Sequence, residues 1–265
     1  MSSLLGKVAV VTGGCKGIGW GIANRFLSDG AKLVVCDTDL LAGQEAIVSQ
    51  WAHQPGHLRV LRADVSKSKD MEAAIAEAVT AFGGVDILAN CAGIQRYGTV
   101  VDTPEDVWDT VMAVNLKGIF LASKYAVPEM AKRGGGSIIN IASVQAYASQ
   151  AGVAAYTASK GAIVALTRAM ALDHADAGIR VNAICPASID TPMLRWAADL
   201  WKGKSTAEAT LEAWGKAHPI GRIGAVSEIA AVASLMAGDE CPFMTGADVK
   251  VDGGVLSKLA IILPE

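Results

Sequence analysis

Short apolar runs alternate with longer amphipathic stretches along most of the chain. The apolar runs are rich in Val and Ile and nearly continuous, which is typical of strands that are covered on both faces. The expected strands span residues 7–12, 32–36, 58–61, 85–90, 137–142, 180–184 and 248–251. The expected helices span residues 19–28, 40–51, 69–82, 104–133, 153–175 and 227–237. This alternation favours right-handed βαβ units and predicts an α/β fold with a doubly wound, seven-stranded parallel sheet.

One segment, residues 187–218, breaks the alternation between an expected strand and the next expected helix. It is rich in Ala and Trp, and a segment of this length within a compact domain is usually a functional lid or a variable decoration. A chain of 265 residues is short enough for one core, so we expect a single domain over residues 1–265 that contains a substrate lid at 187–218. Thr103 is expected to cap the helix that follows it, with Pro104 in the first turn.

Composition and charge exclude several classes of protein. Hydrophobic residues make up 52% of the chain and charged residues 18%, so the chain can form a large core and is not intrinsically disordered. The net charge of −3 argues against a nucleic-acid partner, and no apolar run reaches the roughly 18 residues that a membrane helix needs. The start of the chain leads into a strand too early for a signal peptide, and the five scattered cysteines fit a reducing compartment, so we expect a cytoplasmic protein. The four histidines lack metal-ligand spacing, so we expect no metal.

A glycine-rich turn follows the first expected strand and opens the first expected helix. It reads Thr-Gly-Gly-Cys-Lys-Gly-Ile-Gly over residues 12–19. Such a turn lets the helix N-terminus present free N–H groups to a pyrophosphate, and glycine lacks the Cβ that would block the approach. Asp37 lies at the end of the second expected strand, 18 residues after Gly19. The sequence therefore predicts a dinucleotide site.

Asp37 also bears on which dinucleotide binds. Its carboxylate can accept hydrogen bonds from both hydroxyls of the adenosine ribose, and its charge would repel a 2′-phosphate, so it favours NAD over NADP. The alternative for Asp37 is an N-cap of the following helix. Lys16 leaves two options open, because its ammonium could reach a 2′-phosphate or point into water.

Tyr156 and Lys160 lie four residues apart on an expected helix and therefore share one face of it. A free tyrosine has a pKa near 10, and a fixed ammonium beside it, together with the positive nicotinamide of an oxidised cofactor, would lower that pKa. Such a tyrosine can exchange a proton with an alcohol or carbonyl oxygen near neutral pH. A Tyr–Lys pair at this spacing is also common on ordinary helix surfaces, so the neighbouring motifs decide its meaning.

Several ordered motifs accompany the pair. They are the TGxxxGxG turn at 12–19, Asp64-Val65, Asn90-Cys91-Ala92-Gly93, Asn115, Ser143 thirteen residues before Tyr156, the YxxxK pair, Cys185-Pro186-Ala187, Ile189-Asp190-Thr191-Pro192, Thr245-Gly246 and Val251-Asp252-Gly253-Gly254. With them the chain resembles the short-chain dehydrogenase/reductase family over essentially its whole length, which implies a Rossmann-type domain. Two positions depart from the usual pattern, since Ala187 stands where Gly is common and Cys91 stands in place of Ala.

The resemblance implies a role for each matching residue. Tyr156 would be the general acid and base, and Ser143 would hydrogen-bond the substrate oxygen. Lys160 would hold the nicotinamide ribose and lower the tyrosine pKa, and Asn115 would position a water that relays protons. The cofactor-binding residues would be Gly13, Cys15, Lys16, Gly17, Ile18, Gly19, Asp37, Asp64, Val65, Asn90, Ala92, Gly93, Tyr156, Lys160, Pro186, Ile189 and Thr191. The alternatives are a strand-end cap for Ser143 and a helix-kink residue for Asn115.

The sequence indicates the substrate less directly than the cofactor. The residues expected to face it are Gln95, Ser143, Gln145, Gln150, Tyr156 and Ala187, with Arg96, Trp196 and Trp201 beside them. Buried amides need hydrogen-bond partners, so the glutamines favour a polar substrate. We expect hydride transfer between NAD(H) and a secondary alcohol or ketone on a small polyol, sugar or sugar-acid-like molecule. Gln145 and Arg96 could instead face solvent or a subunit boundary.

Two other functions compete with this one. A 3-oxoacyl-thioester reductase would favour NADPH and a basic docking surface, and both Asp37 and the net negative charge argue against it. A catalytically silent dinucleotide-binding scaffold or sensor is the alternative from another class, and the presence of all four catalytic side chains argues against it.

The resemblance also implies a homotetramer in which helices 104–133 and 153–175 pair across an interface. The apolar tail at 259–265 is expected to pack on a neighbouring subunit, because an exposed apolar tail is unfavourable. We further expect Glu265 and the terminal carboxylate to reach a neighbouring active site.

Overall fold

The computed structural model describes residues 4–40 and 56–259. They form one sheet of seven parallel strands, as the sequence predicts. The strand order is β3-β2-β1-β4-β5-β6-β7. The strands are β1 (Val8–Thr12), β2 (Lys32–Asp37), β3 (Leu58–Arg62), β4 (Ile87–Asn90), β5 (Gly136–Ile141), β6 (Ile179–Pro186) and β7 (Asp248–Val251). The expected helix at 40–51 lies almost entirely outside the described residues.

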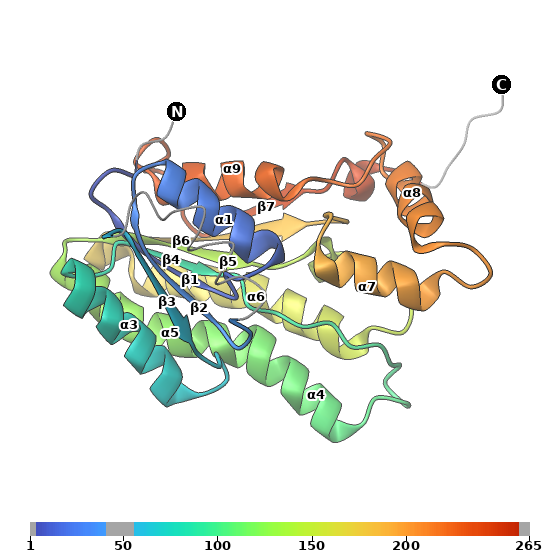
Figure 1. The fold of residues 1–265 in the computed structure, drawn as a ribbon, viewed down its shortest axis with the longest axis horizontal. Coiled ribbons are helices and arrows are strands. Elements are labelled where there is room, and N and C mark those ends of the chain that lie inside the picture. The colour runs from blue at the N-terminus through green and yellow to red at the C-terminus, as the bar shows by residue number, and fades with distance from the viewer. Residues whose placement is uncertain (1–3, 41–55, 260–265) are drawn as a thin grey trace.

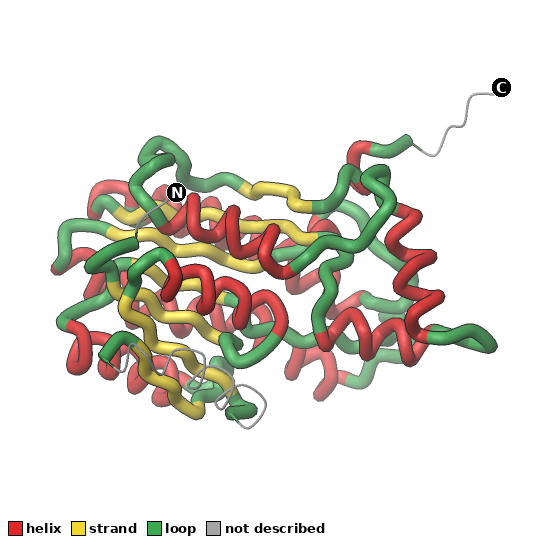
Figure 2. The backbone as a smooth tube through the Cα atoms, turned by 45° about the horizontal axis from the view of Figure 1, so that its top comes forward, coloured by secondary structure: helices red, strands yellow, loops and turns green. Residues whose placement is uncertain are grey.

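Helices cover both faces of this sheet (Figure 1). On one face lie α1 (Gly17–Ser28) and α9 (Val226–Ala237), which also pack against each other. On the other face lie α3 (Ser68–Phe82), α5 (Gly118–Lys132) and α6 (Ala154–Asp173). Figure 2 shows the same three layers after a rotation of the molecule. The expected doubly wound architecture is confirmed.

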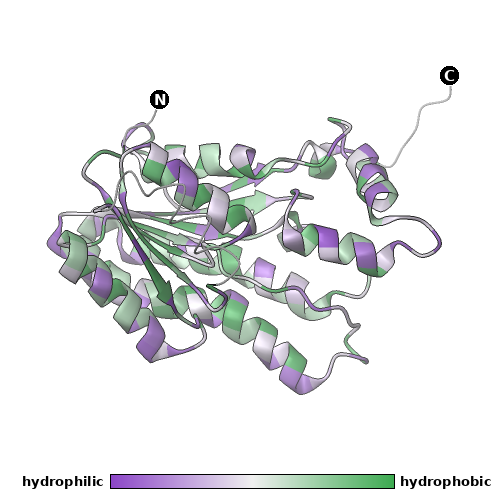
Figure 3. Cartoon of the chain, viewed as in Figure 1, coloured by the Kyte–Doolittle hydropathy of each residue, from purple (hydrophilic) through white to green (hydrophobic). Residues whose placement is uncertain are grey.

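The continuous apolar runs form strands because both of their faces are covered. Successive side chains of a strand point to opposite faces, so Ala9 and Val11 of β1 join the core beneath α1 while Val8 and Val10 join the core beneath α3 and α5. Every residue of β1 is buried, and the central strands appear as the most hydrophobic part of the molecule in Figure 3.

The strand order reverses at the centre of the sheet. β1 pairs with β2 on one side and with β4 on the other, so the loops after β1 and β4 diverge in opposite directions. In open parallel sheets a ligand crevice forms at the carboxyl ends of the strands at such a point.

The expected helix at 104–133 is interrupted. α4 (Glu105–Met112) and α5 are joined by a π-helical segment, Ala113–Lys117, rather than by continuous α-helix. Widened turns of this kind are frequent at functional sites, and this one contains Asn115.

The predicted cap by Thr103 is wrong. α4 begins at Glu105, and Pro104 occupies the N-cap position. The hydroxyl of Thr103 donates instead to the carbonyl of Thr99 at 2.6 Å, which closes the turn before the helix.

Segment 187–218 forms two helices at one end of the sheet, α7 (Pro192–Trp201) and α8 (Ala207–Ala217) (Figure 1). Each begins at a threonine cap, since the hydroxyl of Thr191 accepts from the Leu194 N–H and that of Thr206 from the Ala209 N–H. Among the described residues, no helix is both long enough and apolar enough to span a membrane.

Candidate active site

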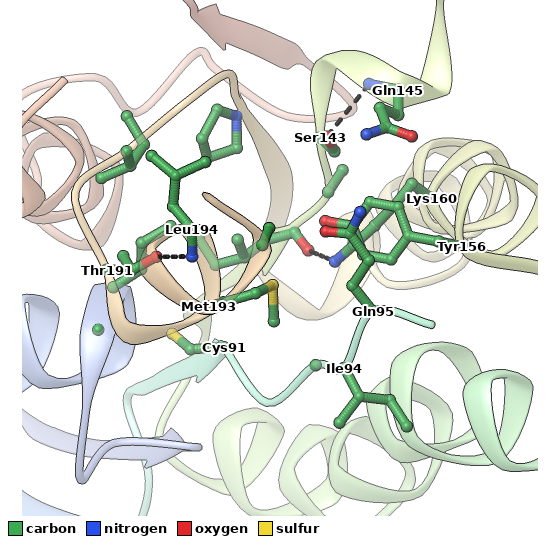
Figure 4. Close-up of a pocket in the computed structure, with 18 of the residues that line it drawn as sticks. Cys91, Ile94, Gln95, Ser143, Gln145, Tyr156, Lys160, Thr191, Met193 and Leu194 are labelled. Atoms are coloured by element: carbon green, nitrogen blue, oxygen red, sulfur yellow. Dashed lines mark hydrogen bonds between the residues drawn. The ribbon is translucent and has the colours of Figure 1, made fainter. Parts of the chain in front are cut away.

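A cavity of about 730 Å³ opens at the carboxyl ends of the central strands. Residues from the turn after β1, the ends of β2, β4, β5 and β6, and helices α6, α7 and α8 line it. Most of the predicted site residues meet here: Gly13, Lys16, Gly17, Ile18, Gly19, Asp37, Asp64, Val65, Ala92, Gly93, Gln95, Ser143, Gln145, Gln150, Tyr156, Lys160, Pro186, Ala187, Ile189 and Thr191. Figure 4 shows part of this lining.

The turn after β1 has the form that a pyrophosphate site needs. Gly13 has a φ of +62°, and a Cβ placed on it would lie 2.6 Å from the Cα of Ala92, so only glycine lets the two loops approach. A Cβ on Gly19 would lie 2.2 Å from the Gly13 carbonyl oxygen. The start of α1 has no side-chain cap and no acidic residue in its first turn, so its N–H groups and positive dipole end favour an anion. These residues fit the diphosphate of a dinucleotide.

Asp37 is held at the end of β2 on the wall of the cavity. Its Oδ2 accepts from the N–H of Cys15 at 3.1 Å, and its Oδ1 accepts from the N–H of Asp39 at 3.1 Å. A carboxylate can accept about four hydrogen bonds, so acceptor capacity remains on the cavity side. Asp37 caps no described helix.

The Lys16 ammonium is held by a protein carboxylate, an arrangement that is not among the two expected ones. It pairs with Asp39 at 2.8 Å, and this pair raises the pKa of Lys16. Lys16 still lines the cavity.

Tyr156 and Lys160 project from α6 into the floor of the cavity. The Lys160 ammonium donates to the Ile141 carbonyl at 2.8 Å and lies 5.4 Å from the centre of the Tyr156 ring. Ser143 follows the end of β5 by two residues. Figure 4 shows Gln95, Tyr156 and Lys160 gathered on one side of the view, with Met193 and Leu194 of α7 on the other.

In the protein chain alone, burial raises the pKa of Tyr156 to about 12, and this effect outweighs the lowering by Ser143. The lowering that we expect from Lys160 together with a bound oxidised cofactor stays a prediction. Burial also lowers the pKa of Lys160 to about 8. Both shifts have the same cause, because each charged form is disfavoured in a site removed from water.

Ser143 serves as a cap and also lies beside the tyrosine. Its Oγ accepts from the N–H of Gln145 at 3.1 Å, which starts a short 3₁₀ turn over Val144–Ala146. The same side chain lines the cavity together with Tyr156 and acts to lower the tyrosine pKa. The strand-end cap and the catalytic position are therefore compatible.

Asn115 is fully buried and well bonded. Its Oδ1 accepts from the Ile94 N–H at 2.8 Å, and its Nδ2 donates to the Ile94 carbonyl at 2.9 Å and to the hydroxyl of Ser159 at 3.0 Å. Ser159 in turn donates to the Tyr156 carbonyl at 2.7 Å. The widened turn thus ties the loop after β4 to the helix that carries the tyrosine.

Two predicted cofactor residues do not reach the cavity wall. The Cys15 side chain is buried in the core under α1, although its N–H holds Asp37. Asn90 is buried with its Nδ2 donating to Asn140 at 2.9 Å, while its Oδ1 has no hydrogen-bond partner among the described residues. The side chains of both residues point into the protein core and not into the cavity, because successive side chains at strand ends and turns point in different directions.

The substrate side agrees in part with the prediction. Gln95, Gln145, Gln150 and Ala187 line the cavity, and the Oε1 of Gln145 accepts from the hydroxyl of Thr157 at 3.2 Å. Trp196 and Trp201 do not line it, and Arg96 is exposed. The sequence of α7 alone does not show which loop the helix packs against, so the positions of its two tryptophans could not be predicted from it.

Comparison with known proteins agrees with this geometry. The family model described as enoyl-(acyl carrier protein) reductase matches residues 13–256. The 2-(R)-hydroxypropyl-CoM dehydrogenase of Xanthobacter autotrophicus is 37% identical over 94% of this chain and 98% of its own. The 2,5-dichloro-2,5-cyclohexadiene-1,4-diol dehydrogenase of Sphingobium indicum is 37% identical over 95% of this chain and 96% of its own.

A solved structure extends the likeness to the whole fold. The ligand-free aldohexose dehydrogenase of Thermoplasma acidophilum superposes with a TM-score of 0.90 at 36% identity and covers 100% of both chains. The chain belongs to the short-chain dehydrogenase/reductase family. It is an oxidoreductase of that family, and these named relatives act on hydroxyl groups.

Three aromatic or imidazole side chains of this short-chain dehydrogenase reach the cavity although the sequence did not single them out as site residues. They are Tyr97, Trp214 and His218. His218 is buried, and its Nδ1 donates to the Trp214 carbonyl at 2.8 Å. Position could have indicated Tyr97 and His218, since one follows Gln95 by two residues and the other ends the segment 187–218.

No cluster of His, Cys, Asp or Glu side chains suited to a metal ion occurs in the described parts of the chain.

Proposed function

We propose that this enzyme transfers a hydride between NAD(H) and a secondary alcohol or ketone on a small polyol, sugar or sugar-acid-like molecule. The observation that carries the proposal is the meeting of Ser143, Tyr156 and Lys160 in one cavity with a phosphate-binding turn. The activities named for the relatives, on a hydroxypropyl group, a cyclic diol and aldohexoses, support a CH–OH substrate.

The choice of NAD rests on Asp37. Its carboxylate is fixed by two backbone N–H groups and borders the cavity, where it would accept hydrogen bonds from ribose hydroxyls and repel a 2′-phosphate. Lys16, the base that could oppose it, is paired with Asp39. Pro186, Ile189 and Thr191 would hold the nicotinamide end, and Asp64 and Val65 would flank the adenine.

The chemistry that NAD supplies when bound is acceptance of the hydride from the carbinol carbon. The chain supplies the proton path. Tyr156 would exchange the proton of the reacting oxygen, and Ser143 would hydrogen-bond that oxygen as charge develops on it. Because burial keeps the pKa of Tyr156 high, the surroundings of the phenol favour its protonated form, which is the form that donates to a ketone oxygen.

Lys160 and Asn115 would act around this step. The Lys160 ammonium, fixed by the Ile141 carbonyl, would bind the nicotinamide ribose, and Asn115 would hold a water that relays protons. We further propose that α7 and α8 act as the substrate lid of a single domain, and that the enzyme is a cytoplasmic homotetramer. The proposed contact of Glu265 with a neighbouring site lies outside the described residues.

The test is a set of initial rates with NAD and NADP over polyols, sugars, sugar acids and simple secondary alcohols. Tyr156→Phe protein is the blank, because it removes only the proton-carrying hydroxyl, and we expect a rate loss of about 100-fold to 10,000-fold. Tyr125→Phe is the matched control, since the Tyr125 hydroxyl bonds Ser68 on the surface.

Three results would contradict the proposal. Activity on acyl thioesters with NADPH alone would indicate a 3-oxoacyl-thioester reductase. Turnover that survives in Tyr156→Phe would remove the tyrosine from its role. Cofactor binding without turnover of any alcohol, ketone or thioester would indicate a binding protein.

A further inference from the structure

An aromatic cluster joins α7 to the loop after β4. The ring of Tyr97 lies 5.1 Å from that of Trp201 in an edge-to-face arrangement and 5.8 Å from that of Trp196 in a tilted one. Both distances are within the range of favourable ring pairs. The two tryptophans are nevertheless about half exposed, at 46% for Trp196 and 57% for Trp201. Both tryptophan rings contact the ring of Tyr97.

Tyr97 is the member of this cluster that also lines the cavity. Its hydroxyl has no hydrogen-bond partner among the residues that the structure describes, although a phenol can both donate and accept. The aromatic contacts hold the ring, and no protein group uses the hydrogen-bonding capacity of its hydroxyl among the described residues.

Tyr97 and the catalytic Tyr156 line the same cavity. Burial is the main cause that raises the pKa of Tyr156, and the electrostatic interaction with Tyr97 adds to it, which is in keeping with the two side chains sharing this cavity. Gln95, two residues earlier on the same loop, lines the cavity as well. A substrate in this cavity thus meets further polar side chains besides Ser143 and Tyr156.

We propose that Tyr97 is a substrate-positioning residue whose hydroxyl binds a second substrate oxygen, on the carbon adjacent to the one oxidised. The substrates that suit this arrangement are vicinal diols, α-hydroxy ketones and sugars with a free neighbouring hydroxyl. This inference rests on the proposed function, because it assumes that Tyr156 meets the reacting oxygen.

The geometry explains why the second oxygen would matter for rate. Two fixed hydrogen-bonding points hold a substrate carbon in one orientation, whereas one point leaves the molecule free to rotate. A site built to hydrogen-bond a hydroxyl also disfavours the analogue that lacks it, because the site's polar group then stays unpaired. The preference for the second oxygen is therefore expected in both binding and catalysis.

The experiment compares matched pairs that differ in the neighbouring hydroxyl. Butane-2,3-diol is paired with butan-2-ol, and D-glucose with 2-deoxy-D-glucose, and kcat and KM are measured for wild type, Tyr97→Phe and the control Tyr125→Phe. Tyr97→Phe keeps the ring and its contacts with Trp196 and Trp201. We expect wild type and the control to prefer the hydroxylated member by about tenfold or more in kcat/KM, which corresponds to about 1.4 kcal/mol.

In Tyr97→Phe we expect this preference to fall to within about twofold, with the KM of the hydroxylated member raised and the kinetics of its deoxy partner unchanged. An undiminished preference in Tyr97→Phe overturns the inference. An equal loss for both members also overturns it, because the hydroxyl would then maintain the shape of the pocket. Absence of turnover by wild type on both pairs and on the wider panel overturns the proposed function itself, and this inference with it.

Discussion

The two halves of the cavity are built in different ways. The wall that carries the glycine turn and Asp37 consists of strand ends and backbone, with Gly13 packed against Ala92 and every residue of β1 buried. The wall formed by α7 and α8 consists of side chains, among which Met193 is 36% exposed. A backbone wall admits one ligand shape, whereas a side-chain wall can change with few substitutions, and this fits a constant cofactor opposite a variable substrate.

Among the variants that test the difference between the two walls, Gly13→Ala should have the largest effect, and the effect should be on cofactor affinity. The new Cβ would lie 2.6 Å from the Ala92 backbone in a residue with positive φ, so the two loops must separate. We expect the dissociation constant for the cofactor to rise more than about 100-fold, which is about 2.7 kcal/mol. Isothermal titration with NAD measures it.

Gly203→Ala is the matched control for this variant. Gly203 also has a positive φ, of +57°, but its added Cβ would meet nothing within 4 Å. It should cost about 1–2 kcal/mol of folding free energy and leave cofactor affinity unchanged. Equal losses of affinity in both variants would mean that backbone conformation, and not close approach, limits this wall.

The two walls also differ in how well the sequence predicts them. The turn at 12–19, Asp37 and the Tyr156–Lys160 pair could be predicted because backbone geometry and strand ends restrict their residue types. The pairing of Lys16 with Asp39 and the inward burial of Cys15 could not, because they depend on side-chain directions. The sequence also placed Trp196 and Trp201 toward the substrate, where the structure has them hold Tyr97.

The same limit applies to electrostatics. The spacing of Tyr156 and Lys160 predicts their proximity, and the structure confirms it. The direction of the pKa shift depends on how deeply both are buried, and depth is a property of the whole packed domain. The expectation of a lowered pKa for Tyr156 rests on the Lys160 ammonium and a bound oxidised cofactor, whereas the effect of burial can be seen only in the folded chain.

Trp201→Leu tests the side-chain wall and should have an intermediate effect. The variant keeps an apolar residue but loses the edge-to-face contact with Tyr97, which is worth about 0.5–1.5 kcal/mol. We expect KM for a polyol substrate to rise about threefold to tenfold while the dissociation constant for NAD stays the same.

Leu200→Ala is the control on the same helix, since Leu200 is also about half exposed. It should leave both constants unchanged. A change of cofactor affinity in Trp201→Leu would contradict the separation of the two walls.

The smallest expected effect is on the pH dependence of folding stability. It tests whether burial determines the pKa values of the side chains at the centre of the cavity, where the two walls meet. The pKa of Lys160 is lowered from 10.5 to about 8 by burial, so between these values the unfolded chain binds more protons than the folded one. The contribution of this group to the free energy of unfolding therefore increases as pH rises from about 8 towards 10, so the folded protein becomes more stable. Tyr156 acts in the opposite direction only above pH 10, because its pKa is raised from 10.0 to about 12.

We expect the melting temperature of wild type, relative to that of Lys160→Met, to rise by a few degrees between pH 8 and pH 10, since a change of about 1 kcal/mol shifts it by roughly 2–4 °C for a domain of this size. Lys216→Met removes an exposed ammonium and should follow wild type across this range. Parallel curves for wild type and Lys160→Met would show that the Lys160 ammonium stays solvated, and burial could then not explain the high pKa of Tyr156 beside it.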